Sequence, residues 1–476
     1  MASAPTRRRF LLTSAVVAAG LLLVGCASVA VRPEAAGPES ALAWKAGVAR
    51  VCITPEKPVW MTGYGSRSKP SEGTMLNLYA RALALEAADG GRAVLVTTDV
   101  IGYPASVAQA VADRCREKYG LPRERLMLTV SHTHGGPALR NLLKIISSPK
   151  MTPEHERAVD DYTRVFVSKI VAAVGQALAD LQPARLSFGC GEATFGMNRR
   201  QKTADKGVIL GVNPEGPVDH TVPVLRIDSP EGRLRAVAFL YACHNTTMGG
   251  NIYEFHGDYA GFAEAALEAC HPGAAAMFFI GCGADANPAP RGTPELAREH
   301  GLALAAAVEK ALAGPLTPAG GSLRVAWGEA ALPFAPPPAR EALEDKAKTS
   351  KNVHEVAHAR ALVAALDRDG RLPASYTAPV QAWRFGNEVT LVALPGEVVV
   401  DYALRLKKEL GGGAVWVAGY SNDVFAYVPT RRILEEGGYE PVISMMYYGH
   451  PGPFAPEVEE TLIRKVHEVV GRVQGK

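Results

Sequence analysis

Short apolar runs alternate with stretches of helical periodicity along most of this chain of 476 residues. Residues 93–98 and 126–130 are two such runs, and residues 105–118 and 154–181 are two of the helical stretches. Strands that alternate with helices of this length predict an α/β fold. We therefore expect a single large domain in which helices flank a mixed, mostly parallel sheet.

Five of the predicted strands end in a cluster of glycine, histidine or carboxylate residues. The clusters are Ser-His-Thr-His at 131–134, Cys-His-Asn at 243–245, Gly-Ala-Asp-Ala-Asn at 283–287, Pro-Gly-Glu at 395–397 and Gly-Tyr-Ser-Asn-Asp at 419–423. Polar residues of an ordinary core would fall within strands as often as at their ends. In α/β sheets, ligands bind outside the carboxyl ends of the strands. We therefore predict one shared site at the carboxyl ends.

Three of these residues suggest a metal. His132 and His244 each follow a predicted strand, and Glu397 follows another. Three protein ligands of these kinds, with a fourth position open to water or substrate, are typical of a catalytic zinc site. A single histidine is more often structural, whereas several at one sheet edge favour ligation. The chain contains neither a G-x-S-x-G elbow nor a P-loop, which argues against an ordinary serine hydrolase and a P-loop nucleotide enzyme.

The N-terminus has the features of an export signal. A basic start with three consecutive arginines precedes a short apolar stretch, which ends in Leu-Val-Gly-Cys at residues 23–26. The arginines fit a twin-arginine signal, and Leu-Val-Gly-Cys fits a lipobox in which Cys26 is acylated. The alternative is an ordinary secretory signal in which Cys26 is incidental. We expect a signal peptide over residues 1–26, a tether over 27–43 and a chain anchored by lipid to the cell envelope.

The remaining residues, 44–476, are expected to form the single domain, with an exposed helical excursion over about residues 339–367. The formal net charge of the whole chain is only +3, and its basic residues are scattered. Without a basic stripe, nucleic acid is not an expected partner. The sequence leaves the oligomeric state open.

From about residue 46 to residue 440, the chain resembles the neutral/alkaline, non-lysosomal ceramidase family. The resemblance rests on A-G-V-A-R-V-C-I-T-P, M-T-G-Y-G-S-R, S-H-T-H-G-G-P, G-M-N-R-R, A-C-H-N-T-T-M, G-D-Y-A-G, L-P-G-E and G-Y-S-N-D-V-F-A-Y-V-P-T-R-R, followed by G-G-Y-E. Each motif is short, but their number and order make the likeness specific.

The resemblance implies one zinc ion per chain and a role for particular residues. Its implied ligands are His132, His244, Glu397 and Tyr427. His134 would exchange a proton with the substrate, and Arg199 would lie near the substrate. Asp285 would orient a histidine or, alternatively, cap the following turn.

Two departures from the family pattern bear on the reaction. Asn287 stands where the family carries a serine associated with amide cleavage. An amide side chain cannot act as an alkoxide nucleophile, although it can position water or donate to an oxyanion. The chain is also expected to lack the immunoglobulin-like C-terminal domain of ceramide-cleaving members, which makes ceramide a less secure substrate.

We therefore expect an exported, zinc-dependent hydrolase of amide bonds, or of ester bonds, that uses metal-activated water. Its substrate would be an N-acyl lipid or a small amide. One alternative is a metal-binding protein that has lost catalysis, with Asn287 as the sign of that loss. Another is a surface lipoprotein that binds carbohydrate or lipid and whose histidines are structural.

Overall fold

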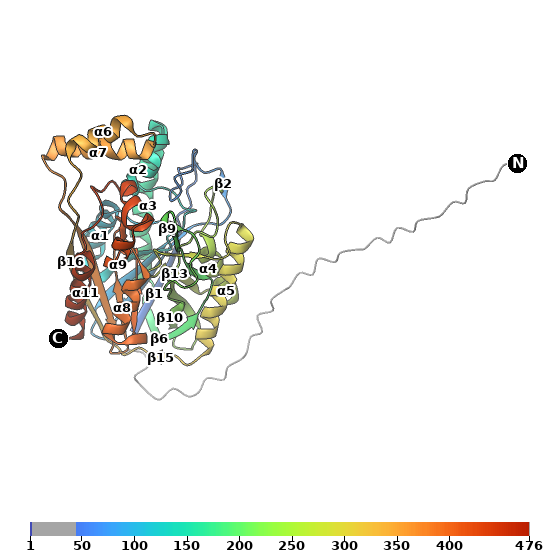
Figure 1. The fold of residues 1–476 in the computed structure, drawn as a ribbon. Helices are drawn as coiled ribbons and strands as arrows, with labels where there is room; N and C mark the ends of the chain where they lie inside the picture. The colour runs from blue at the N-terminus through green and yellow to red at the C-terminus, as the bar shows by residue number, and fades with distance from the viewer. Residues whose placement is uncertain (2–43, 476) are drawn as a thin grey trace. The chain divides into compact units, whose positions relative to one another are not determined.

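The computed structural model describes Met1 and residues 44–475. Residues 44–475 belong to one compact unit, and the helices and strands of this unit are drawn in Figure 1. The predicted signal peptide, the tether and Cys26 lie outside the described residues. No helix in the described ranges is long and apolar enough to span a bilayer.

The larger sheet has nine strands within the described residues. Eight of them follow the order β13 (Ala275–Ile280), β11 (Leu234–Tyr241), β10 (Thr221–Asp228), β6 (Gln182–Glu192), β1 (Trp44–Cys52), β3 (Tyr79–Glu86), β4 (Arg92–Thr98) and β5 (Leu126–Val130). The short β15 (Thr317–Pro318) pairs with β6. Although β5 and β13 lie at opposite ends of this order, they contact each other. The sheet therefore curls until its two ends meet.

A second sheet packs against the first. Its strands follow the order β16 (Leu323–Pro333), β17 (Ser375–Phe385), β18 (Val389–Ala393) and β20 (Val415–Ala418). Alternate residues of facing strands, such as Leu95 of β4 and Leu391 of β18, share one buried cluster. The ring centroids of Phe188 and Trp416, one from each sheet, lie 5.4 Å apart. Burial of these large side chains joins the two sheets, since each contributes roughly 1.5–3 kcal/mol.

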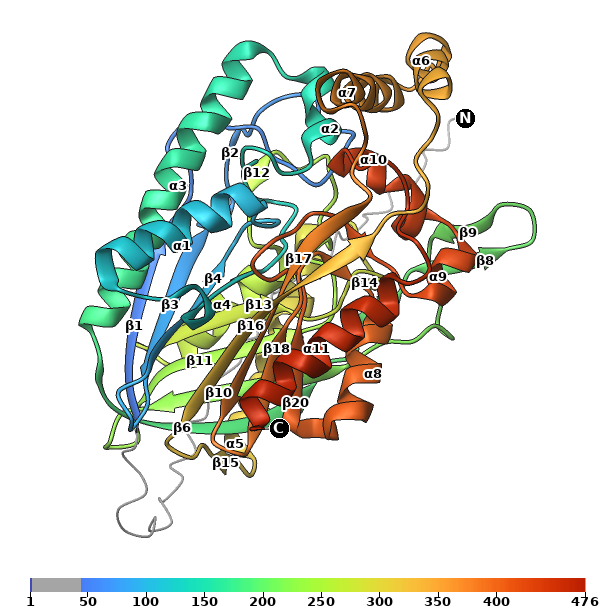
Figure 2. The ribbon, with the colours of Figure 1, turned by 90° about the vertical axis from the view of Figure 1, so that its left-hand side faces the viewer.

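Helices cover the outer faces of both sheets (Figure 2). The larger sheet contacts α3 (Pro153–Ala179), α4 (Asp258–Cys270) and α5 (Pro294–Ala313), and α1 (Ala105–Tyr119) packs on α3. The second sheet contacts α8 (Val400–Leu410) and α11 (Val458–Gln474). The predicted class, a mixed sheet flanked by helices in one large domain, is confirmed.

The share of parallel pairing is lower than the sequence predicts. In the two large sheets only β4–β5, β11–β13 and β18–β20 pair in parallel among the described strands, and the other pairs are antiparallel. Antiparallel strands such as β3 and β11 are buried along almost their whole length, because both of their faces are covered. These strands lack the alternation of buried and exposed residues that marks an antiparallel strand with one wet face, whereas β6 keeps it.

Two helices lie between β16 and β17, in the region for which the sequence predicts a helical excursion. They are α6 (Arg340–Thr349) and α7 (Val353–Asp369), and they stand apart from the sheets in Figure 1. Their small core consists of Leu343, Leu362 and Leu372. The contacts of α7 with α2 (Lys144–Ser147) and α10 (Met445–Tyr448) connect the excursion to the rest of the unit.

Candidate metal centre

His132 follows β5 in a left-handed backbone conformation, with φ of +57°. This conformation is uncommon for a residue with a Cβ and is maintained only where the surroundings impose it. The His132 Nδ1 atom lies 2.5 Å from the Ile101 carbonyl oxygen. Because a carbonyl oxygen can only accept, Nδ1 carries the proton and Nε2 presents a lone pair.

His244 is held in the same way, after the strand next to the opposite end of the sheet. It follows β11, and its Nδ1 atom donates to the Gly283 carbonyl at 2.7 Å. A bridge between Thr133 and Asn245 joins the segments that carry the two histidines. The imidazole planes of His132 and His244 are 83° apart, with ring centroids at 4.8 Å. Hydrogen bonding of Nδ1 to a carbonyl is the arrangement that usually orients a metal-binding histidine.

Glu397 and Tyr427 are direct neighbours on a short parallel ladder. The ladder consists of β19 (Glu397–Val398) and β21 (Tyr427–Val428), with Glu397 opposite Tyr427. The helix α8 begins only at Val400, so Glu397 lies before it, in extended backbone. The turn at Gly396, with φ of +71°, precedes the extended residues that carry the carboxylate toward the histidines.

The imidazoles and the carboxylate converge on one point. Glu397 Oε2 lies 3.2 Å from His132 Nε2 and 3.1 Å from His244 Nε2. The hydroxyl oxygen of Tyr427 is 3.2 Å from the same His244 nitrogen. The other carboxylate oxygen, Oε1, accepts a hydrogen bond from the Tyr448 hydroxyl.

This donor set fits a cation. Burial and the nearby Arg199 charge lower the pKa of His244 to about 4, so its imidazole is neutral at pH 7. Two bare Nε2 lone pairs and a carboxylate oxygen would repel one another without a positive charge between them. Nitrogen and oxygen ligands of this kind suit a zinc ion. Ligand atoms of His132, His134 and His244 also lie within 4.8 Å of one another, so His134 is within reach of the same ion.

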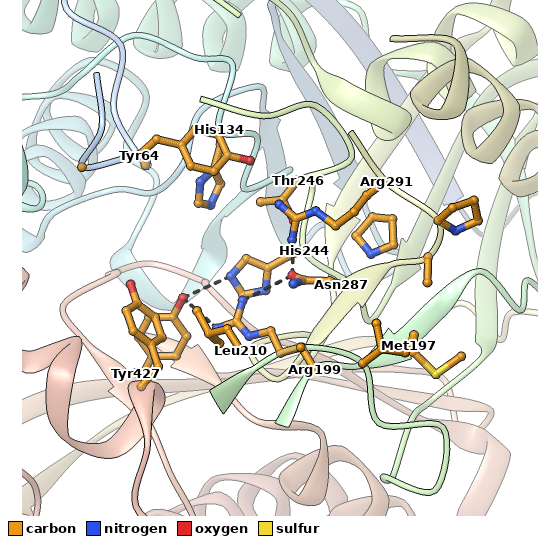
Figure 3. Close-up of a pocket in the computed structure, with 18 of the residues that line it drawn as sticks. Tyr64, His134, Met197, Arg199, Leu210, His244, Thr246, Asn287, Arg291 and Tyr427 are labelled. Atoms are coloured by element: carbon orange, nitrogen blue, oxygen red, sulfur yellow. Dashed lines mark hydrogen bonds between the residues drawn. The ribbon is translucent and has the colours of Figure 1, made fainter. Parts of the chain in front are cut away.

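A cavity of about 540 Å³ opens beside these residues (Figure 3). Its lining includes His134, His244 and Tyr427, together with Tyr64, whose ring centroid lies 4.9 Å from that of His134. The Nε2 atoms of His134 and His132 are 3.4 Å apart. Burial and the neighbouring histidines hold the pKa of His134 well below its ordinary value. His134 therefore offers a neutral imidazole to a bound substrate.

Arg199 connects the predicted metal ligands with Asn287. It donates to the Tyr427 hydroxyl at 3.2 Å and to Asn287 Oδ1 at 3.3 Å. Its charge is compensated by Glu440 Oε1, 2.9 Å from Arg199 Nε. The Thr246 hydroxyl also donates to Asn287 Oδ1, at 3.2 Å. Both neighbours of Asn287 Oδ1 are donors, which fixes the orientation of the amide group. The hydrogens on Asn287 Nδ2 are therefore available to a substrate oxygen.

The sequence leaves Asp285 two roles, to orient a histidine or to cap the following turn, and in the structure its carboxylate has other partners. Its Oδ1 accepts from the Val400 backbone N–H at 2.8 Å, and Oδ2 accepts from Asn198 Nδ2 at 3.3 Å. Val400 is the first residue of α8, and a carboxylate at a helix N-terminus satisfies one of the free N–H groups there. Burial raises the pKa of Asp285 to about 7. Asp285 therefore fixes the start of α8, which follows the segment that carries Glu397.

Tyr448 and Thr246 are functional candidates that sequence reasoning missed, because each acts through a partner distant in the chain. No local sequence pattern marks the contact of Tyr448 with Glu397.

A compact H-E-V-A-H motif at residues 354–358 has the spacing of a zinc-protease helix. On α7, however, His354 Nε2 donates to the Ile146 carbonyl and His358 Nε2 to the His450 carbonyl. The two imidazoles are thus directed at separate backbone groups, and the motif forms no metal site here.

The comparisons with known proteins identify the family of this chain. The family model of the neutral/alkaline non-lysosomal ceramidase N-terminal region matches residues 44–318. The neutral ceramidase of Pseudomonas aeruginosa is 29% identical over 252 residues, which are 51% of this chain and 36% of that protein. Neutral ceramidase A of Dictyostelium discoideum is 27% identical over 217 residues, 43% of this chain and 28% of that protein. The sequence alignments thus span about a third of the length of these relatives.

Solved structures extend the likeness in fold. The crystal structure of the Pseudomonas aeruginosa neutral ceramidase has a TM-score of 0.69 at 22% identity, over 91% of this chain and 75% of that one. A ceramidase complexed with C2 gives a TM-score of 0.70 at 22% identity, over 90% of this chain and 75% of that one. Glu397 and Tyr427 lie beyond the residues that the family model matches, and the tertiary structure brings them to the histidines. The family model matches more than half of the residues of this chain. The chain therefore belongs to the neutral/alkaline non-lysosomal ceramidase family.

Proposed function

We propose that this chain is a zinc-dependent hydrolase that cleaves the amide bond of N-acyl compounds. The observation that carries the proposal is the convergence of His132 Nε2 and His244 Nε2 on Glu397 Oε2. Family membership supports the reaction class, because the curated relatives are neutral ceramidases. Ceramide itself is one candidate substrate among N-acyl lipids.

His132, His244, Glu397 and Tyr427 would hold the metal, one ion per chain. A bound zinc ion polarises a carbonyl and lowers the pKa of a coordinated water to about 7. The Tyr427 hydroxyl is buried, and burial raises its pKa well above the ordinary value. The Arg199 guanidinium, which donates to the same hydroxyl, partly offsets that effect and favours an oxygen that can act as a ligand.

Asn287 would stabilise the oxyanion that develops on the substrate carbonyl. Arg199 and Thr246 hold its Oδ1 from two sides, so the amide plane is fixed before the substrate binds. A preorganised donor of this kind is typically worth about 3 kcal/mol of the barrier. This role suits an amide side chain, whereas that of a nucleophile does not. Water is then the attacking group.

His134 would move the proton that the reaction requires. Its imidazole is neutral at pH 7 because burial lowers its pKa, so it can accept a proton as water attacks. The resulting imidazolium returns the proton to the leaving nitrogen, which departs as an amine.

The test is the metal content of the purified chain, paired with hydrolysis of a fluorogenic N-acyl amide before and after chelation. We expect about one zinc ion per chain and loss of turnover in chelator, with recovery when zinc is restored. Zinc without turnover on any N-acyl amide would favour the catalytically inactive metal-binding alternative. Activity that persists in the metal-free chain would contradict the proposal.

We also propose that the chain is exported and anchored at Cys26 to the cell envelope, where it would meet lipid substrates. The basic start and the Leu-Val-Gly-Cys sequence support this location. Several acyl chains would hold the domain firmly, because each buried methylene contributes about 0.8 kcal/mol of membrane affinity. Cell fractionation tests it. The wild-type chain should sediment with membranes, and the Cys26→Ser variant should not.

A further inference from the structure

A second arginine lines the cavity without a partner that neutralises it. Arg291 follows β14 (Ala286–Pro288) and lies at the exposed rim of the cavity. In Figure 3 its guanidinium group points inward, beside Thr246. Among the carboxylates of the described residues, none forms an ion pair with Arg291, whereas Arg199 is paired with Glu440.

The other ionisable groups nearby form no ion pair with Arg291. The buried Asp258 carboxylate accepts hydrogen bonds from the backbone N–H groups of Thr247, Met248 and Tyr259. Tyr64, whose hydroxyl donates to the Met248 carbonyl at 2.7 Å, lies beside Arg291. Burial raises the pKa of Tyr64, although the Arg291 charge lowers it, so the phenol stays neutral at pH 7. The Glu397 carboxylate faces the histidines. Arg291 is therefore available to an anion that enters the cavity.

The opposite wall of the cavity is apolar. Met197, Leu210 and Val212 line it, and Leu210 and Val212 are 49% and 54% exposed. In the view of Figure 3, Met197 and Leu210 lie on the other side of His244 from Arg291. A ligand that spans the cavity would place an apolar chain against one wall and a negative group against the other. The hydrolysable bond would lie between them, next to His244.

We propose that Arg291 selects substrates whose amine part carries a carboxylate, so that the preferred substrates are N-acyl amino acids with a long acyl chain. The inference rests on the proposed amide hydrolysis and names its substrate class. Water adds to the acyl carbon, the carbon–nitrogen bond breaks, and the nitrogen takes up a proton. The products are a fatty acid and a free amino acid. A neutral N-acyl amino alcohol would bury the same chain but leave Arg291 without an anionic partner.

The experiment compares two substrates of equal chain length, N-dodecanoylglycine and N-dodecanoylethanolamine, with the zinc-loaded enzyme. A charge-assisted contact predicts at least about tenfold higher kcat/KM for the glycine conjugate. Arg291→Gln should reduce kcat/KM for that conjugate by about 10- to 100-fold, mainly through KM, and change the ethanolamide by less than about threefold. Arg298→Gln, an exposed arginine of α5 that does not line the cavity, is the matched control and should change neither value.

Binding is measured separately from turnover by calorimetry with the sulfonamide analogues, N-(dodecanesulfonyl)glycine and N-(dodecanesulfonyl)ethanolamine, which resist hydrolysis. If the wild-type enzyme binds the glycine analogue more tightly and Arg291→Gln abolishes this preference, the inference is supported. That result supports it even if neither amide is hydrolysed and the proposed function fails. Hydrolysis of both amides with no dependence on Arg291 overturns the inference and leaves the proposed function intact. Absence of both hydrolysis and charge-selective binding overturns both.

Discussion

His244 Nε2 lies 3.1 Å from Glu397 Oε2, although 153 positions separate the two residues in the chain. Both atoms are acceptors, because the proton of His244 is on Nδ1, which donates to the Gly283 carbonyl. A contact between two buried acceptors is unfavourable unless a cation lies between them. The pair therefore supports the proposal of a metal ion at this site.

Replacing Glu397 by glutamine should remove most of the zinc affinity. The variant keeps the shape of the side chain but loses the negative charge that balances the ion. Loss of a hydrogen bond that only supports a metal-binding side chain typically lowers the metal affinity by 10- to 100-fold. Loss of the charge on the metal-binding side chain itself should therefore lower the zinc affinity by more than about 100-fold. Equilibrium dialysis with metal analysis measures the change. Glu409→Gln, a partly exposed residue of α8, is the control, and equal affinity in both variants would contradict the assignment.

Tyr448→Phe should weaken zinc binding by about tenfold without removing it. The Tyr448 hydroxyl donates to the Glu397 oxygen that faces away from the histidines and thereby orients the carboxylate. The adjacent Tyr447, which lines the cavity, provides the control in Tyr447→Phe. Zinc titration of wild type, Tyr448→Phe and Tyr447→Phe measures the difference in affinity. If Tyr448→Phe binds zinc like wild type, the hydroxyl has no positioning role.

Asn287→Ala should lower kcat by about 100-fold while zinc content stays unchanged, because it removes an oxyanion donor and not a ligand. Thr246→Val removes only one of the two hydrogen bonds that hold Asn287, so its effect should be smaller. Asn287→Ser, which introduces a hydroxyl group, should retain more amide cleavage than the alanine variant. Steady-state kinetics with metal analysis test all three. Loss of zinc in Asn287→Ala would show that the residue supports the metal instead.

Gly63→Ala should impair catalysis through His134. A Cβ at this position would lie 2.5 Å from His134 Nδ1, too close for the imidazole to stay in place. We expect more than about a tenfold loss in kcat with zinc retained. Gly90→Ala is a close control, because Gly90 also has a positive φ, of +79°, but a Cβ there meets no atom within 4 Å. Both variants should lose about 1–2 kcal/mol of stability from backbone strain, and only Gly63→Ala should lose activity.

The free energy of unfolding should fall as the pH drops from about 6.5 to 4, in part because of His450. Burial lowers its pKa to about 4, and its Nε2 donates to the Phe425 carbonyl at 2.8 Å. In this pH window the unfolded chain binds a proton that the folded imidazole does not, so stability decreases on acidification. His450 alone should account for about 2 kcal/mol between pH 7.5 and pH 5.

Urea unfolding of wild type and His450→Gln at these two pH values measures the contribution. The glutamine can still donate to the Phe425 carbonyl but does not titrate, so the variant should lose about 2 kcal/mol less stability on acidification. Equal losses in both proteins would exclude a buried neutral histidine at this position.

The sequence indicated which residues belong to the site, because each follows an apolar run that predicts a strand. Ligands of α/β proteins bind at the carboxyl ends of such strands. His132, His244 and Glu397 were all found in this way, and the structure brings them together. Tyr427 and Arg199 were found only through the family resemblance. Tyr448 and Arg291 had no signal of either kind.

The sequence by itself determined the mixed class of the fold, the strand-end clusters and the residue types that suit zinc. The strand directions and the contacts within the site were decided by tertiary structure. Strands covered on both faces are apolar throughout, so their residues do not reveal whether neighbours run parallel or antiparallel. The curl that brings β5 to β13, and His132 to the His244 that follows the neighbouring strand β11, comes from the packing of the whole sheet between its helices and the second sheet. No local pattern encodes such a long-range contact, because it depends on burial summed over many strands.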